Sequence, residues 1–225
     1  MQENTIQLPK KTDEGKPYIS FSQYKNWRAK KSFNLGIEGR QEYILEYFHG
    51  YGFPDKGWAE FGNDVEDYIC ERKGAEKFTD SEKETLGSIE TLGVYQKRFE
   101  IDLGEFVVIG YIDDLLEDLT KIRDYKTASK NSSKQYYTDT YWQLDLYAMW
   151  VVQQTGKIPE LEVVIVERKG NCMFQGGREV LSVGNEVWYV PRETSYERLD
   201  WLKNDLIQVA TEISDAWKVY QKLIS

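Results

Sequence analysis

The residues of this chain that are best suited to chemistry are Asp113, Asp124 and Lys126. Asp113 ends an apolar run that starts at Val107, and a turn near Leu116 would fold this run against the next one as a hairpin. Side chains alternate between the faces of a strand, so Asp124 and Lys126 emerge together, close to Asp113. Two carboxylates at a sheet edge repel each other unless a cation lies between them, and a hard divalent ion is the usual one. The spacing therefore predicts a metal-dependent phosphodiesterase.

A surface ion pair is a simpler alternative to a metal site, and residues outside the hairpin help to distinguish the two. Taken alone, the spacing of Asp124 and Lys126 also fits a solvated hairpin with a surface ion pair. A later helical segment carries Gln143 and Tyr147, four residues apart and therefore on one face. We expect Gln143 to form hydrogen bonds near the metal or the scissile phosphate, and Tyr147 to support the lysine or the DNA backbone. Their alternative role is to pack a half-buried helix.

Length, charge and cysteine content limit the possible classes. The 225 residues suit one domain with a sizeable core, and 29 basic against 38 acidic residues give a formal net charge of −9. This charge disfavours a protein that holds nucleic acid mainly by overall charge, but not a nuclease with a local basic patch. The two cysteines, Cys70 and Cys172, have no ligand-type spacing, which disfavours zinc and iron–sulfur sites. With no signal peptide and no apolar run of membrane-spanning length, we expect a cytoplasmic protein.

The hydrophobic pattern predicts an α/β fold with a mixed central sheet flanked by helices, plus an N-terminal helical part. We expect a flexible segment over 1–18 and a single domain over 19–225, made of a helical part (19–97), a sheet core (98–192) and a C-terminal helix (193–225). Ser22 and a capping box over 81–84 are expected to begin two of the early helices. Expected strands cover 99–103, 107–116, 122–127 and 161–167, with short antiparallel strands in 172–190. Expected later helices cover 135–154 and 194–224.

Several motifs together resemble one known family. They are Gly110-x-x-Asp113, Asp124-Tyr-Lys126-Thr127, Gln143-x-x-x-Tyr147 and, upstream, Gly62-Asn-Asp-Val-Glu66 and the helix opening Ile19-Ser-Phe-Ser-Gln-Tyr24. In this order they resemble the RecB-like branch of the PD-(D/E)XK nuclease superfamily, which includes phage exonucleases and CRISPR-associated nucleases. The resemblance extends from about residue 20 to 147 and implies a restriction-endonuclease-like core. The four cysteines of the cluster-bearing members are absent from the sequence, so the chain resembles the phage-type form without an iron–sulfur cluster.

The resemblance implies a role for each motif residue. Asp113, Asp124 and the backbone carbonyl of Tyr125 would bind Mg²⁺ or Mn²⁺, and Glu66 would complete the acidic set from the helical side. Lys126 would orient or activate a water molecule and share the developing negative charge. These residues, with Gln143 and Tyr147, form the expected catalytic set.

Local basic residues are candidates for holding the DNA strand. Lysines and an arginine surround Trp27 near the first helix, and others follow the hairpin in a Ser/Asn-rich stretch. Alternating cations and aromatic rings suit contact with a single strand, although a solvated helix face has the same pattern. The candidates are Lys25, Arg28, Lys30, Lys31, Thr127, Lys130 and Lys134.

The expected function is a metal-dependent DNA exonuclease that processes linear ends in phage-type recombination, replication or repair. The end-processing role is implied by the resemblance, whereas the spacing alone implies phosphodiester hydrolysis. Two alternatives remain: a structure-specific endonuclease of the same fold, and a catalytically silent DNA-binding module. The expected partners are DNA, a single-strand annealing or recombination protein, and further copies of the chain.

Overall fold

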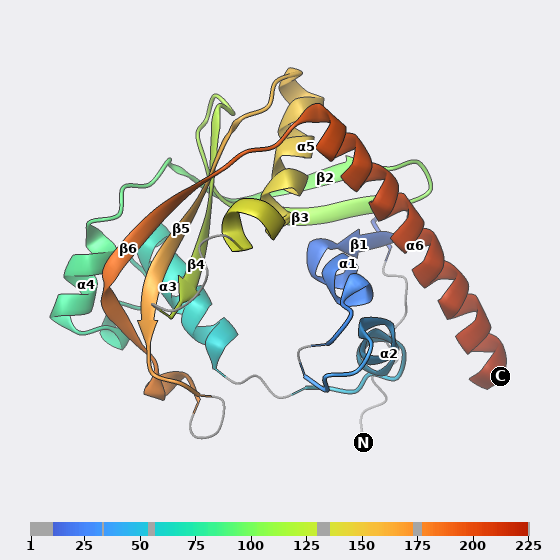
Figure 1. Cartoon of the computed structure of the whole chain (residues 1–225), viewed down its shortest axis with the longest axis horizontal. Coiled ribbons are helices and arrows are strands. Elements are labelled where there is room, and N and C mark those ends of the chain that lie inside the picture. The colour runs from blue at the N-terminus through green and yellow to red at the C-terminus, as the bar shows by residue number, and fades with distance from the viewer. Residues whose placement is uncertain (1–10, 33, 54–56, 130–135, 173–176, 225) are drawn as a thin grey trace. The chain divides into compact units, whose positions relative to one another are not determined.

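The computed structural model describes residues 11–32, 34–53, 57–129, 136–172 and 177–224. Its central element is a mixed six-stranded sheet with strand order β1-β3-β4-β5-β6, in which β2 also pairs with β3 (Figure 1). The strands are β1 (Tyr18–Ser20), β2 (Val94–Asp102), β3 (Val107–Leu115), β4 (Lys121–Ala128), β5 (Glu160–Lys169) and β6 (Ser182–Arg192). The predicted α/β class with a mixed sheet flanked by helices is confirmed. In the described ranges, no helix has the length and apolarity needed to cross a lipid bilayer.

In the part of the chain that the structure describes, six α-helices and four short helical turns join and cover these strands. The α-helices are α1 (Phe21–Arg28), α2 (Gly39–Tyr43), α3 (Trp58–Glu71), α4 (Asp80–Gly87), α5 (Gln143–Thr155) and α6 (Tyr196–Ile224). The turns are the π-type η1 (Ile44–Phe48) and η3 (Tyr136–Thr140), and the 3₁₀-type η2 (Ala75–Lys77) and η4 (Arg178–Val180). Since α5 connects the parallel strands β4 and β5, it forms the crossover that such a pair requires.

The contacts within the chain group it into two compact units. The first unit comprises Met1–Phe53, Arg98–Gly110 and Glu197–Ser225, and the second comprises Pro54–Lys97 and Tyr111–Tyr196. Asp113, Asp124, Lys126, Gln143, Tyr147 and Glu66, the whole expected catalytic set, belong to the second unit.

In the second unit, alternation along β4 assigns successive side chains to opposite faces of the sheet. Tyr125 packs into a core with Phe61 and Val65 of α3 and with Val164 and Val166 of β5. Its neighbours in sequence therefore face the other side, where η3 and α5 lie. A sheet covered on both faces gives these polar neighbours a largely dry environment.

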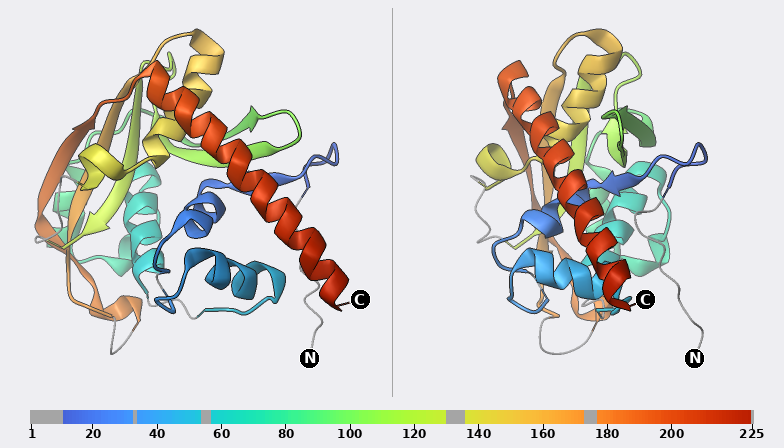
Figure 2. Two further views of the ribbon diagram at one scale, coloured as in Figure 1. Left: turned by 45° about the vertical axis from the view of Figure 1, so that its right-hand side comes forward. Right: turned by 90° about the vertical axis from the view of Figure 1, so that its right-hand side faces the viewer.

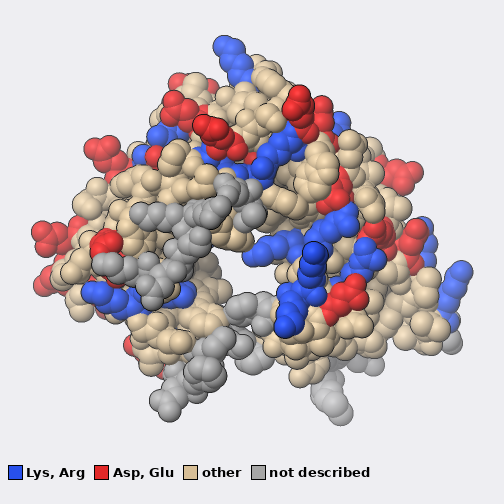
Figure 3. All heavy atoms as spheres, in the orientation of Figure 1, with Lys and Arg blue, Asp and Glu red and all other residues tan. Residues whose placement is uncertain are grey.

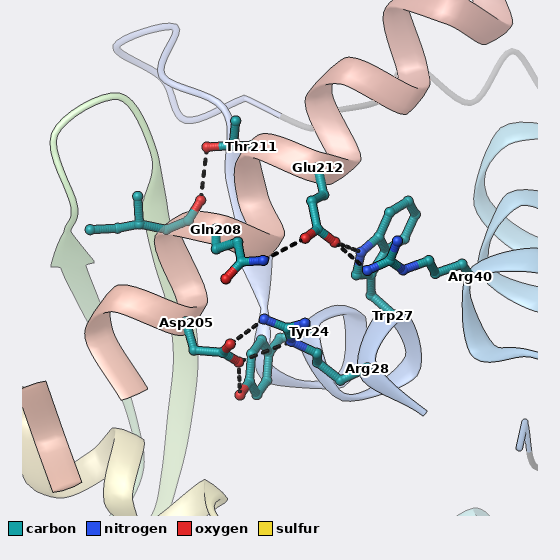
Figure 4. Close-up of polar contacts among 9 residues, drawn as sticks. Tyr24, Trp27, Arg28, Arg40, Asp205, Gln208, Thr211 and Glu212 are labelled. Carbon is teal, nitrogen blue, oxygen red and sulfur yellow. Dashed lines mark hydrogen bonds and ion pairs between the residues drawn. The ribbon is translucent and has the colours of Figure 1, made fainter. Parts of the chain in front are cut away.

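The first unit is held together by acidic residues of α6, which continues as one long helix in both views of Figure 2. Asp205 accepts hydrogen bonds from the hydroxyl of Tyr24 (2.7 Å) and from Nε of Arg28 (3.0 Å). Two turns further on, Glu212 accepts from the indole of Trp27 (2.8 Å) and from Arg40 (2.7 Å) (Figure 4). These bonds tie α1 to α6 and satisfy the polar atoms of two buried aromatic residues of α1.

Packing within the first unit explains why the Gly-x-x-Asp motif has a glycine at Gly110. A Cβ atom on Gly110 would lie 2.6 and 2.7 Å from ring atoms of Phe99, which comes from the adjacent strand β2. Any larger residue at Gly110 would therefore displace the ring. Gly62, the glycine of the upstream motif, has open space around it, and nothing in the structure explains its presence there.

The structure corrects four predictions of local structure. The N-cap of α1 is Ser20, whose capping box uses Gln23, and not Ser22. The N-cap of α4 is Thr79 with Glu82, two residues before the predicted box. The predicted helix over 135–154 is a π-type turn followed by α5. Residues 18–20, assigned to the lead-in and the first helix cap, form β1 parallel to the start of β3. Residues 1–10 of the predicted flexible segment lie outside the described residues.

We expect Arg192→Met to destabilise the protein by about 3–5 kcal/mol, the usual cost of breaking a buried ion pair. The side chains of Arg192 and Asp145 are each 1% exposed, with Nη2 of the arginine 2.7 Å from Oδ2 of the aspartate. Arg192 also donates a hydrogen bond to the carbonyl of Thr138, so it holds both α5 and η3. Denaturant unfolding followed by circular dichroism measures the loss.

The exposed pair between Lys73 and Glu71 provides the control, because Lys73→Met should leave the stability nearly unchanged. Replacing both partners of the buried pair, as in Arg192→Met with Asp145→Leu, should recover most of the stability. A single Arg192→Met variant as stable as the Lys73→Met control would contradict a structural role for the buried pair.

Candidate active site

The hairpin of β3 and β4 brings Asp113, Asp124 and Lys126 together. The pairing of Asp114 with Arg123 places Asp113 opposite Asp124, and both aspartates are buried, at 6% and 0% exposure. Nζ of Lys126 lies 2.7 Å from Oδ2 of Asp124 and 3.7 Å from Oδ2 of Asp113. The lysine side chain is 29% exposed, so solvent reaches the trio from one side. The predicted carboxylate–ammonium cluster is therefore present, and it is buried instead of forming a surface pair.

Tyr125, between Asp124 and Lys126, forms hydrogen bonds to aspartates on both faces of the sheet. Its amide donates to Oδ2 of Asp113 at 3.1 Å, and its phenol hydroxyl donates to Oδ2 of Asp114 at 2.7 Å on the opposite face. Asp114 also accepts from the amides of Leu92 (2.7 Å) and Gly93 (3.1 Å). Asp114 thus faces away from the site, and it is buried and structural.

Gln143 and Tyr147 are connected to the carboxylates by hydrogen bonds through Tyr141, a residue that was not predicted from the sequence. The hydroxyl of Tyr141 lies 3.1 Å from Oδ2 of Asp124 and 2.7 Å from Oε1 of Gln143, so its single proton is shared between two acceptors. The amide of Gln143 in turn donates to the hydroxyl of Tyr147. Gln143 and Tyr147 are thereby joined to the site through Tyr141. In the sequence, the one sign that Tyr141 belongs to the site is its position two residues before Gln143.

Glu66 lies at the margin of this cluster. It accepts a hydrogen bond from the side-chain amide of Gln96, a residue with a positive φ of 48° that sequence reasoning also missed. Within the described ranges, no three Asp, Glu, His or Cys side chains form a group able to hold a metal ion by themselves. The structure therefore leaves Glu66 outside a three-carboxylate cluster, and its role as a ligand stays a prediction.

The oxygen atoms around Lys126 suit a hard divalent ion. Oδ1 of Asp124 is buried and has no hydrogen-bond partner among the described residues, and the carbonyl of Tyr125 lies 2.8 Å from Nζ of Lys126. Mg²⁺ is commonly held by one or two carboxylates with water completing its shell. Asp113, Asp124 and the Tyr125 carbonyl fit that requirement without Glu66.

Comparison with known proteins gives this arrangement a family. The sequence profile of the PD-(D/E)XK nuclease superfamily matches residues 43–219. The chain belongs to the PD-(D/E)XK nuclease superfamily. The predicted resemblance is thus confirmed at the level of the superfamily, and the matched region contains every residue of the expected catalytic set.

Two solved structures are similar to this PD-(D/E)XK nuclease at low sequence identity, and the first of them shares its fold. A protein from Eubacterium rectale, an exonuclease by name alone, is 13% identical, with a TM-score of 0.53 over 91% of this chain and 82% of its own. A phage-related exonuclease from Haemophilus somnus 129PT is 14% identical, with a TM-score of 0.40 over 82% of this chain and 80% of its own. No curated protein matches the sequence.

Burial and mutual repulsion shift the ionisation of the nuclease site. Burial, followed by the charge of Asp124, raises the pKa of Asp113 to about 7. Burial, followed by the charge of Asp113, likewise raises the pKa of Glu66 to about 7. Burial lowers the pKa of Lys126, but Asp124 and Asp113 outweigh it, so the pKa lies above its ordinary value. Lys126 is consequently a stable ammonium, suited to stabilising charge and not to removing a proton.

These shifts predict how the stability of the ion-free nuclease depends on pH. The folded state binds a proton at Asp113 more tightly than the unfolded state, so stability falls as pH rises from about 4 to about 7. Each pKa unit corresponds to about 1.4 kcal/mol, so the loss is on the order of a few kcal/mol. Added Mg²⁺ should therefore raise the melting temperature more at pH 8 than at pH 5.

Thermal unfolding at both pH values, with Mg²⁺ or with chelator, measures this effect. Other carboxylates also titrate, so the informative quantity is the difference between the wild type and Asp113→Asn, whose amide does not ionise. An identical pH dependence in the two proteins would contradict the assignment to Asp113.

The expected DNA-binding residues differ in their exposure and in their contacts. Lys25, Lys30 and Lys31 are exposed in and just after α1, where basic side chains gather on the face in Figure 3. Arg28 is engaged by Asp205, and Trp27 is buried, so this tryptophan does not offer a stacking surface. Thr127 follows Lys126 on β4 and therefore projects from the other face. Lys130 and Lys134 lie outside the described residues.

Proposed function

We propose that this PD-(D/E)XK nuclease is a metal-dependent DNA exonuclease that hydrolyses phosphodiester bonds of linear DNA, with Mg²⁺ or Mn²⁺ as its cofactor. The observation that carries the proposal is the convergence of Asp113, Asp124 and Lys126 in a buried but partly accessible cluster. A structural ion pair needs one carboxylate, whereas this cluster keeps two buried carboxylates beside one ammonium, and burial raises the pKa of both. Such an excess of negative charge suits the binding of a cation.

Each side chain has a role in this proposal. A bound divalent ion would lower the pKa of a water molecule and neutralise charge on the scissile phosphate. Asp113, Asp124 and the Tyr125 carbonyl hold the ion, and the ammonium of Lys126 stabilises charge on the attacked phosphate. Tyr141 and Gln143 fix the orientation of Asp124 through their hydrogen bonds. Glu66 is proposed as a further acidic ligand of the ion.

The preference for an exonuclease rests on similarity. The sequence motifs resemble phage-type exonucleases of the RecB-like branch, and the Eubacterium rectale protein of the same fold is an exonuclease by name. On this basis, we place the enzyme in end processing during phage-type recombination, replication or repair. A single-strand annealing or recombination protein and further copies of the chain are the proposed partners. Its location in the cytoplasm, of the host cell if the chain is viral, stays a prediction.

The exposed lysines near α1 are the proposed contacts to the DNA backbone. Lys25, Lys30 and Lys31 provide positive charge in a chain whose overall charge is negative. Arg28 would contribute mainly by holding α1 against α6. Lys130, Lys134 and Thr127, which follow Lys126 in the sequence, are proposed to contact DNA near the site.

Digestion of end-labelled linear DNA beside a closed circle tests the proposal, in Mg²⁺, in Mn²⁺ and with chelator. Ion-dependent loss of the linear DNA alone, absent in Asp124→Asn, is the expected result, and the position of the label gives the polarity. Cleavage of the circle would instead identify a structure-specific endonuclease. If neither substrate is cleaved, a DNA-binding module without catalysis becomes the better explanation.

A further inference from the structure

Arg168, near the end of β5, is a half-buried cation with no carboxylate partner in the part of the chain that the structure describes. Its guanidinium lies over the ring of Trp58 at the start of α3, with Cζ 5.5 Å from the ring centroid. Nε of Arg168 is buried and has no hydrogen-bond acceptor among the described residues. Burial lowers the pKa of this arginine, and the groups that oppose the shift are Cys172 and Tyr137, not a carboxylate. A buried charge is costly when nothing pairs with it.

Other arginines that lie over aromatic rings are engaged by acceptors of the protein itself. They are Arg40, Arg72, Arg123 and Arg178. Each of them donates a hydrogen bond to a carboxylate or to a backbone carbonyl. Arg168 has the same kind of ring contact without such an acceptor among the described residues, so its donors are suited to a ligand of negative charge.

The register of the sheet places Arg168 near the catalytic lysine. In the parallel pair of β4 and β5, Lys126 is opposite Ile165, and Ala128, the last residue of β4, is opposite Glu167. Arg168 follows just past the end of β4, so that strand does not separate it from η3. At about 3.3 Å per residue, Arg168 is at most about 10 Å along the strand from the partner of Lys126.

Tyr137 of η3 connects Arg168 to the site electrostatically. Burial raises the pKa of Tyr137, and the positive charges of Lys126 and Arg168 both act against this shift. The ring of Tyr137 is 5.4 Å from that of Tyr141, whose hydroxyl is bonded to Asp124. Arg168 therefore belongs to the surroundings of the active site, although no role for it was predicted from the sequence.

We propose, on the basis of the function proposed above, that Arg168 binds a backbone phosphate of the DNA strand, beyond the scissile phosphate that Lys126 contacts. The planar guanidinium presents parallel N–H donors that match two phosphate oxygens, and the ring of Trp58 supports its plane. The phosphate supplies the negative charge that pairs with this cation. Because phosphate contacts fix the position of a strand without reading its bases, Arg168 sets the register of the DNA and not a sequence preference.

The salt dependence of DNA binding tests this contact. Anisotropy of a labelled single-stranded oligonucleotide, with Ca²⁺ in place of Mg²⁺, gives the Kd at several salt concentrations. Arg168→Gln should raise the Kd by about tenfold, and it should lower the slope of log Kd against log salt concentration by about 0.7, the value for one phosphate contact. Arg168→Lys keeps the charge, so it should keep the slope and lose only part of the affinity.

Arg72→Gln is the matched control for the loss of one positive charge. Arg72 also lies over an aromatic ring, that of Tyr68, but it follows α3 at the end opposite to Trp58. The Kd and the salt slope of Arg72→Gln should equal those of the wild type. Equal changes in Arg72→Gln and Arg168→Gln would reduce the effect to overall charge and contradict a contact at Arg168.

Oligonucleotides with a single neutral methylphosphonate identify the phosphate. At one position, the substitution should weaken binding to the wild type while weakening binding to Arg168→Gln no further. Such a result shows that the lost phosphate charge and the lost arginine act in the same contact. The same sensitivity in both proteins at every position would contradict the inference.

Thermal unfolding distinguishes a binding residue from a structural one. Because its buried charge is uncompensated within the described chain, Arg168→Met should melt at the temperature of the wild type or above it. The oligonucleotide should raise the melting temperature of the wild type by more than that of the variant. Arg178→Met should instead melt at a lower temperature, since Nε of Arg178 is 2.6 Å from Oδ2 of Asp64.

The outcomes separate this inference from the proposed function. If the wild type cleaves linear DNA while Arg168→Gln has an unchanged Kd and salt slope, the inference is overturned and the nuclease stands. If the wild type shows the predicted contact but does not cleave, the inference stands and the nuclease does not. A wild type that binds no DNA overturns both. If neither Arg168→Gln nor Arg168→Met folds, the arginine is structural and the inference is overturned.

Discussion

Asp124→Asn is expected to reduce ion-dependent DNA cleavage by about 10³-fold, because several kcal/mol of charge stabilisation depend on this carboxylate. The amide keeps the shape of the side chain and can still accept the hydrogen bond from Tyr141. Without one of the two buried carboxylates, Lys126 retains Asp113 as its partner. The variant should therefore be as stable as the ion-free wild type, and turnover of labelled linear DNA measures its loss of activity.

Asp114→Asn is the matched control for this variant. Asp114 is equally buried and is next to Asp113, but it accepts hydrogen bonds from Leu92, Gly93 and Tyr125 on the opposite face. Its neutralisation should cost about 1–3 kcal/mol of stability while leaving turnover per folded molecule unchanged. Loss of cleavage in the Asp114 variant alone would show that the catalytic carboxylate had been assigned to the wrong residue.

Lys126→Met is expected to cleave at least about 10²-fold more slowly than the wild type at saturating Mg²⁺. The ammonium is the positive side chain in direct contact with both aspartates, and methionine has a similar length without the charge. Because both aspartates remain in this variant to hold the ion, the loss must appear in kcat and not in the ion concentration required. Single-turnover cleavage at several Mg²⁺ concentrations separates the two quantities.

Lys121→Met should cleave at the wild-type rate, since Lys121 contacts Glu160 and Glu162 and none of the site residues. A wild-type rate in Lys126→Met would remove the lysine from the chemistry, and a rate restored by excess Mg²⁺ would limit its role to ion binding. Binding of DNA by Lys126→Met, measured with Ca²⁺ in place of Mg²⁺, should change little.

The hairpin of β3 and β4 could be predicted from the sequence because its pattern is local. Alternation of apolar and polar residues located β3 and β4 to within a residue or two, and the period of two then placed Asp124 beside Lys126. The long apolar stripe of α6 was equally clear in the sequence. In each of these cases, the signal lies within the segment itself.

The helix caps and Tyr141 could not be predicted in the same way. Several Ser and Thr residues near Ser20 and Thr79 can all cap a helix, and tertiary contacts decide among them. Tyr141 precedes a helix whose periodicity continues upstream, but its bond to Asp124 joins residues from different elements. Gln96 reaches Glu66 from a backbone conformation that no sequence pattern indicates.

The two faces of β4 limit which insertions and deletions the chain can tolerate. Asp124 and Lys126 serve the site while Tyr125 between them belongs to the core, so a one-residue insertion or deletion within the strand would exchange the two sets. The core would then receive an ammonium and the site a phenol. The turn between Leu115 and Lys121 lies outside this alternation, so a change in its length leaves the two faces of β4 as they are. Loop grafting or domain insertion in this enzyme should therefore use that turn.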